Sequence, residues 1–364
     1  MKFIRPIDGD VLFSVADGVV EDGKLLTEVV VSAPQGQTIF INGNRAQESN
    51  GNYTAQVTLS SYRNTIEAVN ADTQQRQEIR IYWFRDGYRT YRFAVDDVIR
   101  TFENIWRNQE SYSSIFDDPY MAIYRDLHEQ YGTLVHMHIY YENDDGSFNL
   151  TMFPDKYKEE FRANADWLKF TFHARKDKPD SPYMYASYEQ VMQEGQQVAR
   201  EILRFAGEEV VTRVTSQHWA DSNLEATRAF RDLGFDCIDG YFKFDENGVP
   251  MASYYLNREQ IHHAGSRDFW VDHSENILFV KDDIVINEVP LNEIDAYMEN
   301  ITAQQNHAFH YLLTHEQYFY PDYINYQPDY RQCIFTAVDC CHKHGYRPAT
   351  ITSIALDPGW YQKD

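Results

Sequence analysis

The chain has 364 residues, 43% of them hydrophobic, and a formal net charge of −23 at pH 7. Its length fits two or three domains, and so acidic a surface argues against nucleic acid or an anionic membrane as partner. No stretch approaches 18 apolar residues, so we expect no membrane span and a soluble protein. We expect it in the cytoplasm as written, or secreted or periplasmic if a signal peptide was removed. The oligomeric state is left open.

Residues 1–85 carry strand signals throughout. Apolar or alternating runs cover residues 24–32, 38–41, 53–59, 64–71 and 77–84, separated by turn sequences. Short strands at spacings of about ten residues predict a small all-β sandwich. The run IFINGNRAQESNGNYTAQVTLSSYRNTIEAVNAD resembles bacterial immunoglobulin-like modules, which implies an immunoglobulin-like sandwich for residues 1–85.

From residue 86 onward, strand-like runs alternate with helical stretches. The predicted strands are residues 92–95, 132–141, 167–173, 209–215, 235–238, 277–280 and 310–313. Repeated β-α units imply right-handed crossovers and a parallel sheet. Roughly seven units predict an α/β fold for residues 86–364, a distorted (β/α)7-8 barrel. An open doubly wound sheet is the alternative.

Two adjacent carboxylates, Asp96 and Asp97, end the first of these strands. Such a pair is costly to bury, and a fold keeps it readily where a metal or a proton transfer uses it. The alternative is a helix cap before the next segment. We predict that one carboxylate binds a divalent metal and that the other acts as a base.

Histidines recur at the ends of later strands. His173 and His218 follow the third and fourth strands, and His315 follows the last. His136 and His138 share one face of the second strand, because strand side chains alternate. Imidazoles at one barrel mouth predict a metal site, most simply for zinc, with His136 and His138 as weaker candidates.

Arg213 lies within the predicted fourth strand, where a charged residue needs a partner, and Asp96 is the natural one. Of the 27 tyrosines, most are packing residues, yet a flat ring with a polar tip also suits sugars. We place Tyr183, Tyr185 and Trp219 in a sugar subsite. The four cysteines include no CxxC pair and predict buried, reduced thiols.

Several segments resemble the NodB-homology polysaccharide deacetylases, which are metal-dependent carbohydrate esterases on a distorted (β/α) barrel. Phe93-Ala94-Val95-Asp96-Asp97 resembles the first motif of that family, and Leu313-Thr314-His315 resembles the last. His173 matches the first histidine of the second motif, whose other histidine position holds Asp177 here. Of the third motif only Arg213 is kept, and NLEATRAFRDLGFDCI is similar to the helix that follows.

The resemblance implies a deacetylase acting on a carbohydrate. Asp96 would be the base and His315 the acid, and Asp97 would bind the metal with His173. We expect His218 to complete the metal site. Two alternatives stay open: a degenerate carbohydrate-binding relative, and an amidohydrolase-type barrel that uses the histidines at 136, 138, 173 and 218.

Overall fold

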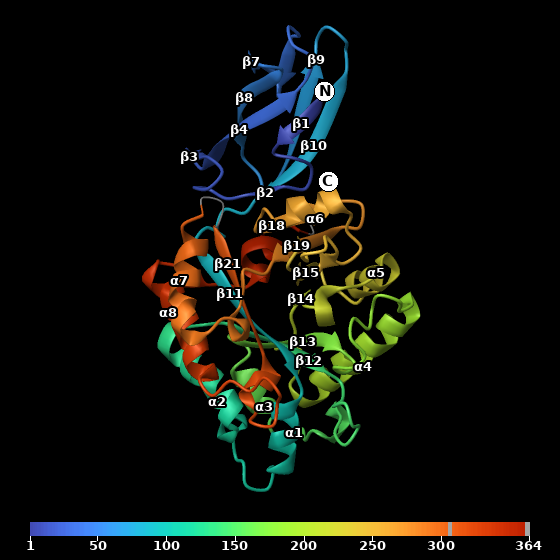
Figure 1. Ribbon diagram of the computed structural model, residues 1–364, viewed down its shortest axis with the longest axis vertical. Helices are drawn as coiled ribbons and strands as arrows, with labels where there is room; N and C mark the ends of the chain where they lie inside the picture. The colour runs from blue at the N-terminus through green and yellow to red at the C-terminus, as the bar shows by residue number, and fades with distance from the viewer. Residues whose placement is uncertain (305–307, 361–364) are drawn as a thin grey trace.

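The computed structural model describes residues 1–304 and 308–360, so the last four residues of the expected second domain lie outside the described residues. A β-sandwich forms one end of an elongated molecule, and a larger α/β body forms the rest (Figure 1). One sandwich sheet runs β1-β4-β8-β7 with β3 beside β4, and the other runs β2-β10-β9-β5-β6. Their bounds are β1 Lys2–Arg5, β2 Val11–Leu12, β3 Val19–Glu21, β4 Lys24–Ser32, β5 Ile39–Ile41, β6 Asn44–Arg45, β7 Gln47–Ser49, β8 Asn52–Leu59, β9 Arg63–Asn70 and β10 Arg76–Trp83.

Alternation of side chains builds the sandwich core. In β8, Tyr53, Ala55, Val57 and Leu59 are buried while the residues between them face outward. The strands pair antiparallel, apart from the parallel pair of β2 and β10. The all-β sandwich predicted for residues 1–85 is therefore present.

The α/β body contains two sheets. The larger runs β13-β12-β11-β21-β20 with β22 beside β11, and its pairs are all parallel. The smaller runs β14-β15-β19-β18, in which only β18 is antiparallel. Their bounds are β11 Thr90–Val98, β12 Val135–Tyr140, β13 Leu168–Ala174, β14 Val214–Thr215, β15 Cys237–Gly240, β18 Phe269–Asp272, β19 Ile277–Lys281, β20 Ile284–Val285, β21 Phe309–His315 and β22 Arg347–Pro348.

The two sheets meet at two seams. At one, the Phe170 N–H donates to Val210 O, and Phe170 bridges to Val211, just before β14. At the other, the chain passes from β19 directly into β20. The predicted α/β class and parallel sheet are thus confirmed, with the strands divided between two joined sheets. The fourth strand is shorter than predicted, so Arg213 precedes it.

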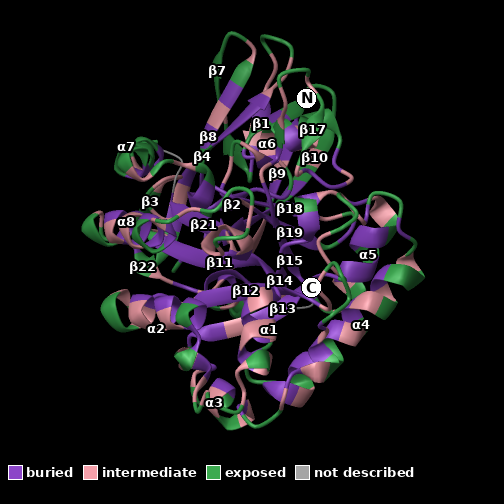
Figure 2. Cartoon of the chain, turned by 60° about the horizontal axis from the view of Figure 1, so that its bottom comes forward, coloured by how far each residue is buried: buried purple, intermediate pink, exposed green. Residues whose placement is uncertain are grey.

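Helices cover the outside of the sheets, and the strands between them are buried (Figure 2). The helices are α1 Arg100–Arg107, α2 Pro119–Tyr131, α3 Lys158–Ala163, α4 Tyr188–Phe205, α5 Leu224–Asp232, α6 Arg258–Ala264, α7 Leu291–Thr302, α8 Tyr330–Lys343 and α9 Asp357–Gly359. Short helical turns are η1 Ile115–Asp117, η2 Leu150–Met152, η3 His218–Ala220, η4 Ile286–Glu288, η5 Glu316–Phe319 and η6 Thr352–Leu356, and β16 Lys243–Phe244 pairs with β17 Pro250–Met251.

The sandwich and the body share a hydrophobic core. Phe13 and Phe84 from the sandwich side pack against Phe269 of β18. The Val271 N–H donates to Gly9 O at 2.9 Å, which joins the backbones of the two parts. The parts therefore pack closely.

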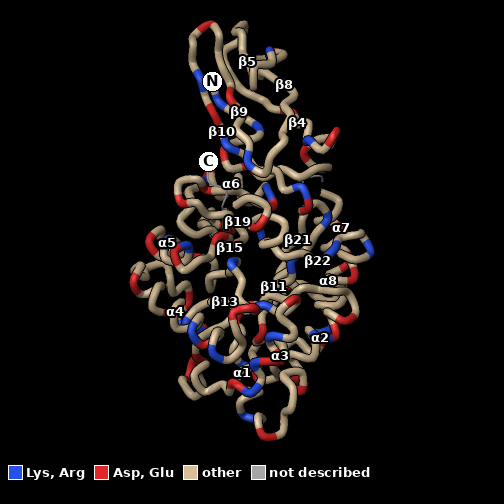
Figure 3. Tube along the Cα trace, turned by 180° about the vertical axis from the view of Figure 1, so that it is seen from behind, with Lys and Arg blue, Asp and Glu red and all other residues tan. Residues whose placement is uncertain are grey.

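The charge distribution, the helices and the cysteines are properties of the whole described chain. Residues of both charge signs are scattered along the sandwich and the body (Figure 3). Within the described residues, no helix has the length and apolar character needed to cross a bilayer. All four cysteines are buried and free, as predicted.

Candidate metal centre

The tip of β11 turns two neighbouring carboxylates toward the same mouth. Val95 pairs with Met137 and Val98 pairs with Ile139, so β11 has one residue more than β12 in this interval. Asp97 takes a left-handed backbone conformation, with φ of 64°. Such a bulge breaks the alternation of side chains, and Asp96 and Asp97 both come within reach of His173.

A second bulge sets His173. Ile139 pairs with Phe172 but Tyr140 pairs with Ala174, which leaves His173 as the extra residue on β13. Its Nδ1 lies 2.6 Å from the carbonyl oxygen of Ser216, which can only accept a hydrogen bond. Nδ1 therefore carries a proton, and Nε2 lies within hydrogen-bond distance of Asp97 Oδ1, at 3.1 Å.

His218 reaches the same point from η3. The two residues after it, Trp219 and Ala220, have φ of 69° and 47°, an unusual turn for residues with a Cβ. His218 Nε2 donates to the carbonyl oxygen of Asp177 at 2.9 Å. Its Nδ1 lies 3.2 Å from Asp97 Oδ1 and 3.2 Å from His173 Nε2.

The three ligand atoms form a nearly equilateral triangle with edges of 3.1 to 3.2 Å. Ligand atoms bound about 2.0–2.1 Å from a tetrahedral zinc ion lie ~3.3 Å apart. Asp97, His173 and His218 are buried and fit a divalent cation with little movement. A carboxylate and two imidazoles suit zinc and other borderline divalent metals.

In the metal-free protein, the positive charge that balances the carboxylates at the triangle comes from a histidine. Burial opposes ionisation of Asp97, but hydrogen bonds from His173 and His218 hold its pKa well below the usual range. Burial alone would lower the pKa of His218, yet Asp177 and Asp97 raise it to about 10. Without an ion, a protonated His218 therefore balances the carboxylates at neutral pH.

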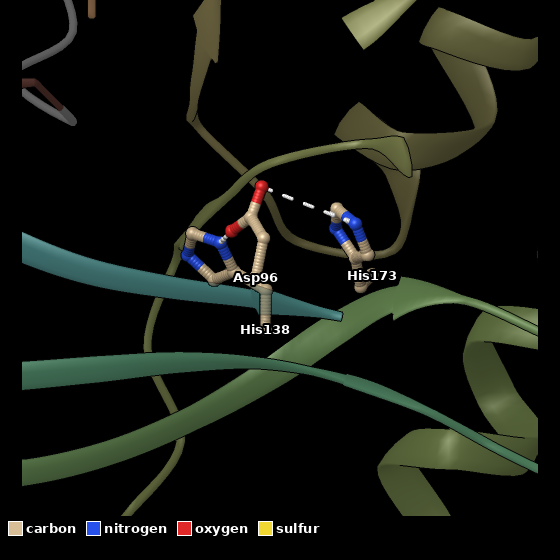
Figure 4. Close-up of side chains that lie close together, drawn as sticks. All are labelled: Asp96, His138 and His173. Atoms are coloured by element: carbon tan, nitrogen blue, oxygen red, sulfur yellow. Dashed lines mark hydrogen bonds and ion pairs between the residues drawn. The ribbon is translucent and has the colours of Figure 1, made fainter. Parts of the chain in front are cut away.

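Asp96 contacts both His138 and, at 3.9 Å, His173 of the triangle, and the three form a second buried group of possible metal ligands (Figure 4). His138 Nδ1 contacts Asp96 Oδ1, and the Arg92 guanidinium lies 2.9 Å from His138 Nε2. Because arginine can only donate, Nε2 is the acceptor and Nδ1–H donates to Asp96. Burial lowers the pKa of His138, consistent with this neutral form. Both nitrogens of His138 are thus engaged away from the triangle.

His315 lies opposite Asp96 in the register of β21 with β11. Asn287 Oδ1 accepts from the backbone N–H of His315 at 2.9 Å and from its Nδ1 at 3.1 Å. Nε2 is the ring nitrogen of His315 that Asn287 does not engage. The carboxylate of the next residue, Glu316, points away from the ring and accepts the N–H groups of Ile99, Arg100 and Thr101 at the start of α1.

Other predicted residues lie away from the cluster. Arg213 pairs with Asp357 at 2.8 Å and with Asp236 at 3.7 Å instead of with Asp96, because it precedes β14. His136 is buried two residues before His138 on β12, where burial lowers its pKa, and within the described residues it belongs to no group of possible metal ligands. This corrects the expected arginine partner and separates His136 from the other histidines.

The three predicted sugar-subsite residues differ in exposure. Tyr183 is fully buried and donates to Glu194 at 3.0 Å, so it packs in the core rather than lining a surface. Trp219 is 52% exposed, and its ring centroid lies 6.0 Å from that of His218. Tyr185 is 93% exposed. Of the three predicted residues, Trp219 is therefore the one that is both exposed and next to a residue of the triangle.

Three further residues contact the site without having been singled out from the sequence. They are Arg92 behind His138, Gln317 with its amide 2.5 Å from Asp97 Oδ2, and Tyr140 with its hydroxyl on Asp97 Oδ1. The alternation of His136, His138 and Tyr140 on one strand face carried a signal for the last of these.

No protein-family model and no curated protein matches the chain. Among solved structures it is similar to a putative polysaccharide deacetylase from Mycobacterium smegmatis, at 10% identity and a TM-score of 0.45, covering 75% of this chain and 91% of that one. It is similar to Agd3, a carbohydrate deacetylase, at 8% identity and a TM-score of 0.38, covering 92% and 70%. A putative polysaccharide deacetylase of Bordetella bronchiseptica involved in O-antigen biosynthesis aligns at 11% identity and a TM-score of 0.34, covering 75% and 92%.

Proposed function

We propose that the protein is a metal-dependent hydrolase that removes acyl groups, most simply acetyl, from a carbohydrate. The observation that carries this is the buried triangle of Asp97, His173 and His218 beside a second, independently held carboxylate, Asp96. The likenesses to solved structures have TM-scores below 0.5, so the proposal rests on this geometry.

Asp97, His173 and His218 would hold the ion, here proposed as zinc. A bound divalent ion supplies Lewis-acid polarisation of the acyl carbonyl and makes water more acidic. His173 and His218 are pre-oriented for this by backbone carbonyls of Ser216 and Asp177, a common way to fix ligand imidazoles.

Asp96 takes the proton of the attacking water in this proposal. His173 and His138 keep its pKa low despite burial, so it is ionised at neutral pH. Its Oδ1 accepts from His138, while Oδ2 lies 3.9 Å from His173 Nε2 and faces the triangle. Oδ2 is therefore the basic oxygen.

His315 protonates the leaving amine or alkoxide. Asn287 holds the Nδ1–H, so Nε2 delivers the proton. His315 lies opposite Asp96 in the pairing of β21 with β11, and a positive charge on its ring would favour the ionised forms of Asp96 and Asp97. General acid and base catalysis by such groups contributes typically about 10²–10⁴-fold each.

A carbohydrate is proposed as substrate on two grounds. Trp219 presents an exposed aromatic face beside His218, and aromatic faces bind sugar rings well. The sequence motifs at Asp96-Asp97 and at Leu313-Thr314-His315 resemble those of polysaccharide deacetylases. The deacetylase type of barrel, the boundary at residues 85 and 86, and an immunoglobulin-like sandwich belong to the same proposal.

Two substitutions test it through metal content and acetate release from acetylated oligosaccharides. Asp96→Asn should leave one bound zinc per chain and lower turnover at least about 10²-fold. Asp97→Ala should lose both the ion and turnover. Equal metal loss in the two variants would show that the roles are misassigned.

The metal count needs one control. Glu299, Cys340 and His344 form another group of possible ligands, nearer the surface. A Cys340→Ser background removes the thiol, so that a remaining ion is counted at the buried triangle. A wild-type chain that takes up no zinc and releases no acetate would instead favour a non-catalytic carbohydrate-binding protein.

A further inference from the structure

Tyr140 brings a fourth oxygen to the metal triangle. It is the last residue of β12, its side chain is buried, and its hydroxyl donates to Asp97 Oδ1. The same hydroxyl lies 2.9 Å from His218 Nδ1. It therefore contacts two of the three atoms proposed as ligands.

The placement of Tyr140 follows from the strand that carries it. His136, His138 and Tyr140 share one face of β12, and the bulge at His173 lies directly beside Tyr140. The phenol ring packs against two imidazoles, with its centroid 5.3 Å from that of His173 and 5.3 Å from that of His218. These two imidazole centroids lie 5.1 Å apart, so the three rings pack around the triangle and hold the Tyr140 hydroxyl at it.

We propose that Tyr140 is itself a metal ligand, binding through its phenolate oxygen as the fourth protein ligand beside Asp97, His173 and His218. The inference rests on the proposed metal site and goes beyond it. On binding, the phenolic O–H bond breaks, its proton goes to solvent, and the oxygen's electron pair goes to the ion. The set then holds two anionic oxygens and two neutral nitrogens, which neutralise a divalent cation.

A phenolate ligand has a spectroscopic signature that a hydrogen-bond donor lacks. Copper(II) is a suitable probe, since nitrogen and oxygen sites bind it more tightly than zinc. Phenolate bound to copper(II) gives a ligand-to-metal charge-transfer band in the visible range. In the Cys340→Ser background, we expect this band in the copper-loaded protein and its loss in Tyr140→Phe.

Tyr91→Phe is the matched control. Tyr91 is also buried on a central strand, and its hydroxyl bonds to Thr133 at 2.8 Å instead of to the triangle. Its variant should keep the band. Tyr140→Phe should also weaken zinc binding about 10-fold or more, whereas Tyr91→Phe should leave it unchanged.

The outcomes separate this inference from the proposed function. If the ion depends on Asp97 but the spectra with and without Tyr140 are the same, Tyr140 is no ligand and only the inference is overturned. If Asp97→Ala binds the ion as well as the parent does, the metal site itself is wrong. A band lost only in Tyr140→Phe supports both.

Discussion

Arg92 is completely buried, yet its guanidinium is poorly satisfied. One nitrogen donates to His138, and the group stacks over the ring of Tyr311 at 5.0 Å. Among the residues that the structure describes, its Nε and Nη1 have no hydrogen-bond partner. A buried charge is costly to desolvate, but this one favours the ionised form of the buried Asp239 and also fixes His138 for Asp96.

Arg92→Met tests that reading. Removing this charge alone leaves the buried carboxylate of Asp239 without its compensation, so the free energy of unfolding should fall by about 3–5 kcal/mol. His138 then loses the donor that fixes its tautomer, and turnover should fall about 10-fold to 100-fold through a misplaced base. Thermal melts and acetate release measure the two effects. A less stable variant with full turnover would contradict the prediction.

The raised pKa of His218 predicts a pH-dependent metal affinity. The metal-free protein holds this imidazole protonated up to about pH 10, and a ligand imidazole must be neutral. Zinc must displace that proton together with the phenolic proton of Tyr140, so affinity should rise about a hundredfold per pH unit between pH 7 and 9, or about tenfold if Tyr140 is not a ligand. Titration calorimetry in buffers of different ionisation enthalpy counts the released protons.

Asp177→Asn supplies the control for that measurement. Asp177 contributes to raising the pKa of His218, and it lies half-exposed outside the triangle. Its loss should reduce proton release at pH 8 and flatten the pH dependence of zinc affinity. A pH-independent affinity would contradict the assignment.

The raised pKa of His218 also affects the stability of the metal-free protein. Because its folded pKa lies above the ordinary 6.5, His218 stabilises the metal-free protein below pH 6.5. This contribution is lost as pH rises through about 10.

At the scale of elements, η5 is tied to the start of α1 by one carboxylate. Ile99, at the N-cap of α1, has no capping side-chain bond. Instead Glu316 accepts from the N–H groups of Ile99, Arg100 and Thr101, each at 2.7 Å. Because only Val98 and Ile99 separate Asp97 from α1, and Gln317 follows Glu316, this cap fixes the chain on both sides of the site.

Glu316→Gln should weaken this cap. An amide has one acceptor oxygen, so at least one of the three N–H groups loses its partner, at a cost of about 1–3 kcal/mol. Burial raises the pKa of Glu316 to about 7 against the effect of those N–H groups. Wild-type stability should therefore fall as pH rises from 4.5 through 7, and the variant should lack that slope. Denaturant unfolding at pH 5 and 8 checks both, and parallel pH profiles would contradict the role.

The elements themselves were largely readable from the sequence, whereas their tips were not. Continuous apolar runs located β11 and β13 within a few residues, because a parallel strand is buried on both faces. The bulges at Asp97 and His173 leave no periodic mark, since they depend on pairing with β12. The sequence alone therefore could not show that Asp97, His173 and His218 meet at one point.

The same reasoning accounts for the arginine. Charge within a predicted strand pointed to Arg213 as the partner of the acidic pair, but pairing decides where a strand begins, and β14 begins at Val214. Arg92 lies within β11 and contacts His138 on the neighbouring strand β12. Sequence spacing could not show which arginine, Arg92 or Arg213, lies near Asp96 and Asp97, because that depends on how the strands pair in the folded sheet.

At the scale of the whole molecule, the sandwich and the body are joined by charge as well as by a shared core. Asp10 pairs with His263 at 2.5 Å, and Arg267 pairs with Asp17 at 3.1 Å. Burial opposes the charge of Arg267, but Asp17 and Asp10 raise its pKa. With polar pairs and apolar packing at one interface, the two parts should unfold in a single transition.

Gly9 is where the backbones of the two parts approach most closely. Its φ is 86°, and an added Cβ would lie 2.1 Å from the carbonyl oxygen of Val271. Gly9→Ala should therefore separate the backbones, lower the midpoint of thermal unfolding and split the single transition into two. Gly36→Ala is the matched control, because Gly36 has a φ of 77° and open space around its Cβ position. The control should cost only the left-handed strain of about 1–2 kcal/mol and keep one transition. Calorimetry distinguishes the two, and equal effects of both substitutions would show that this contact does not hold the parts together.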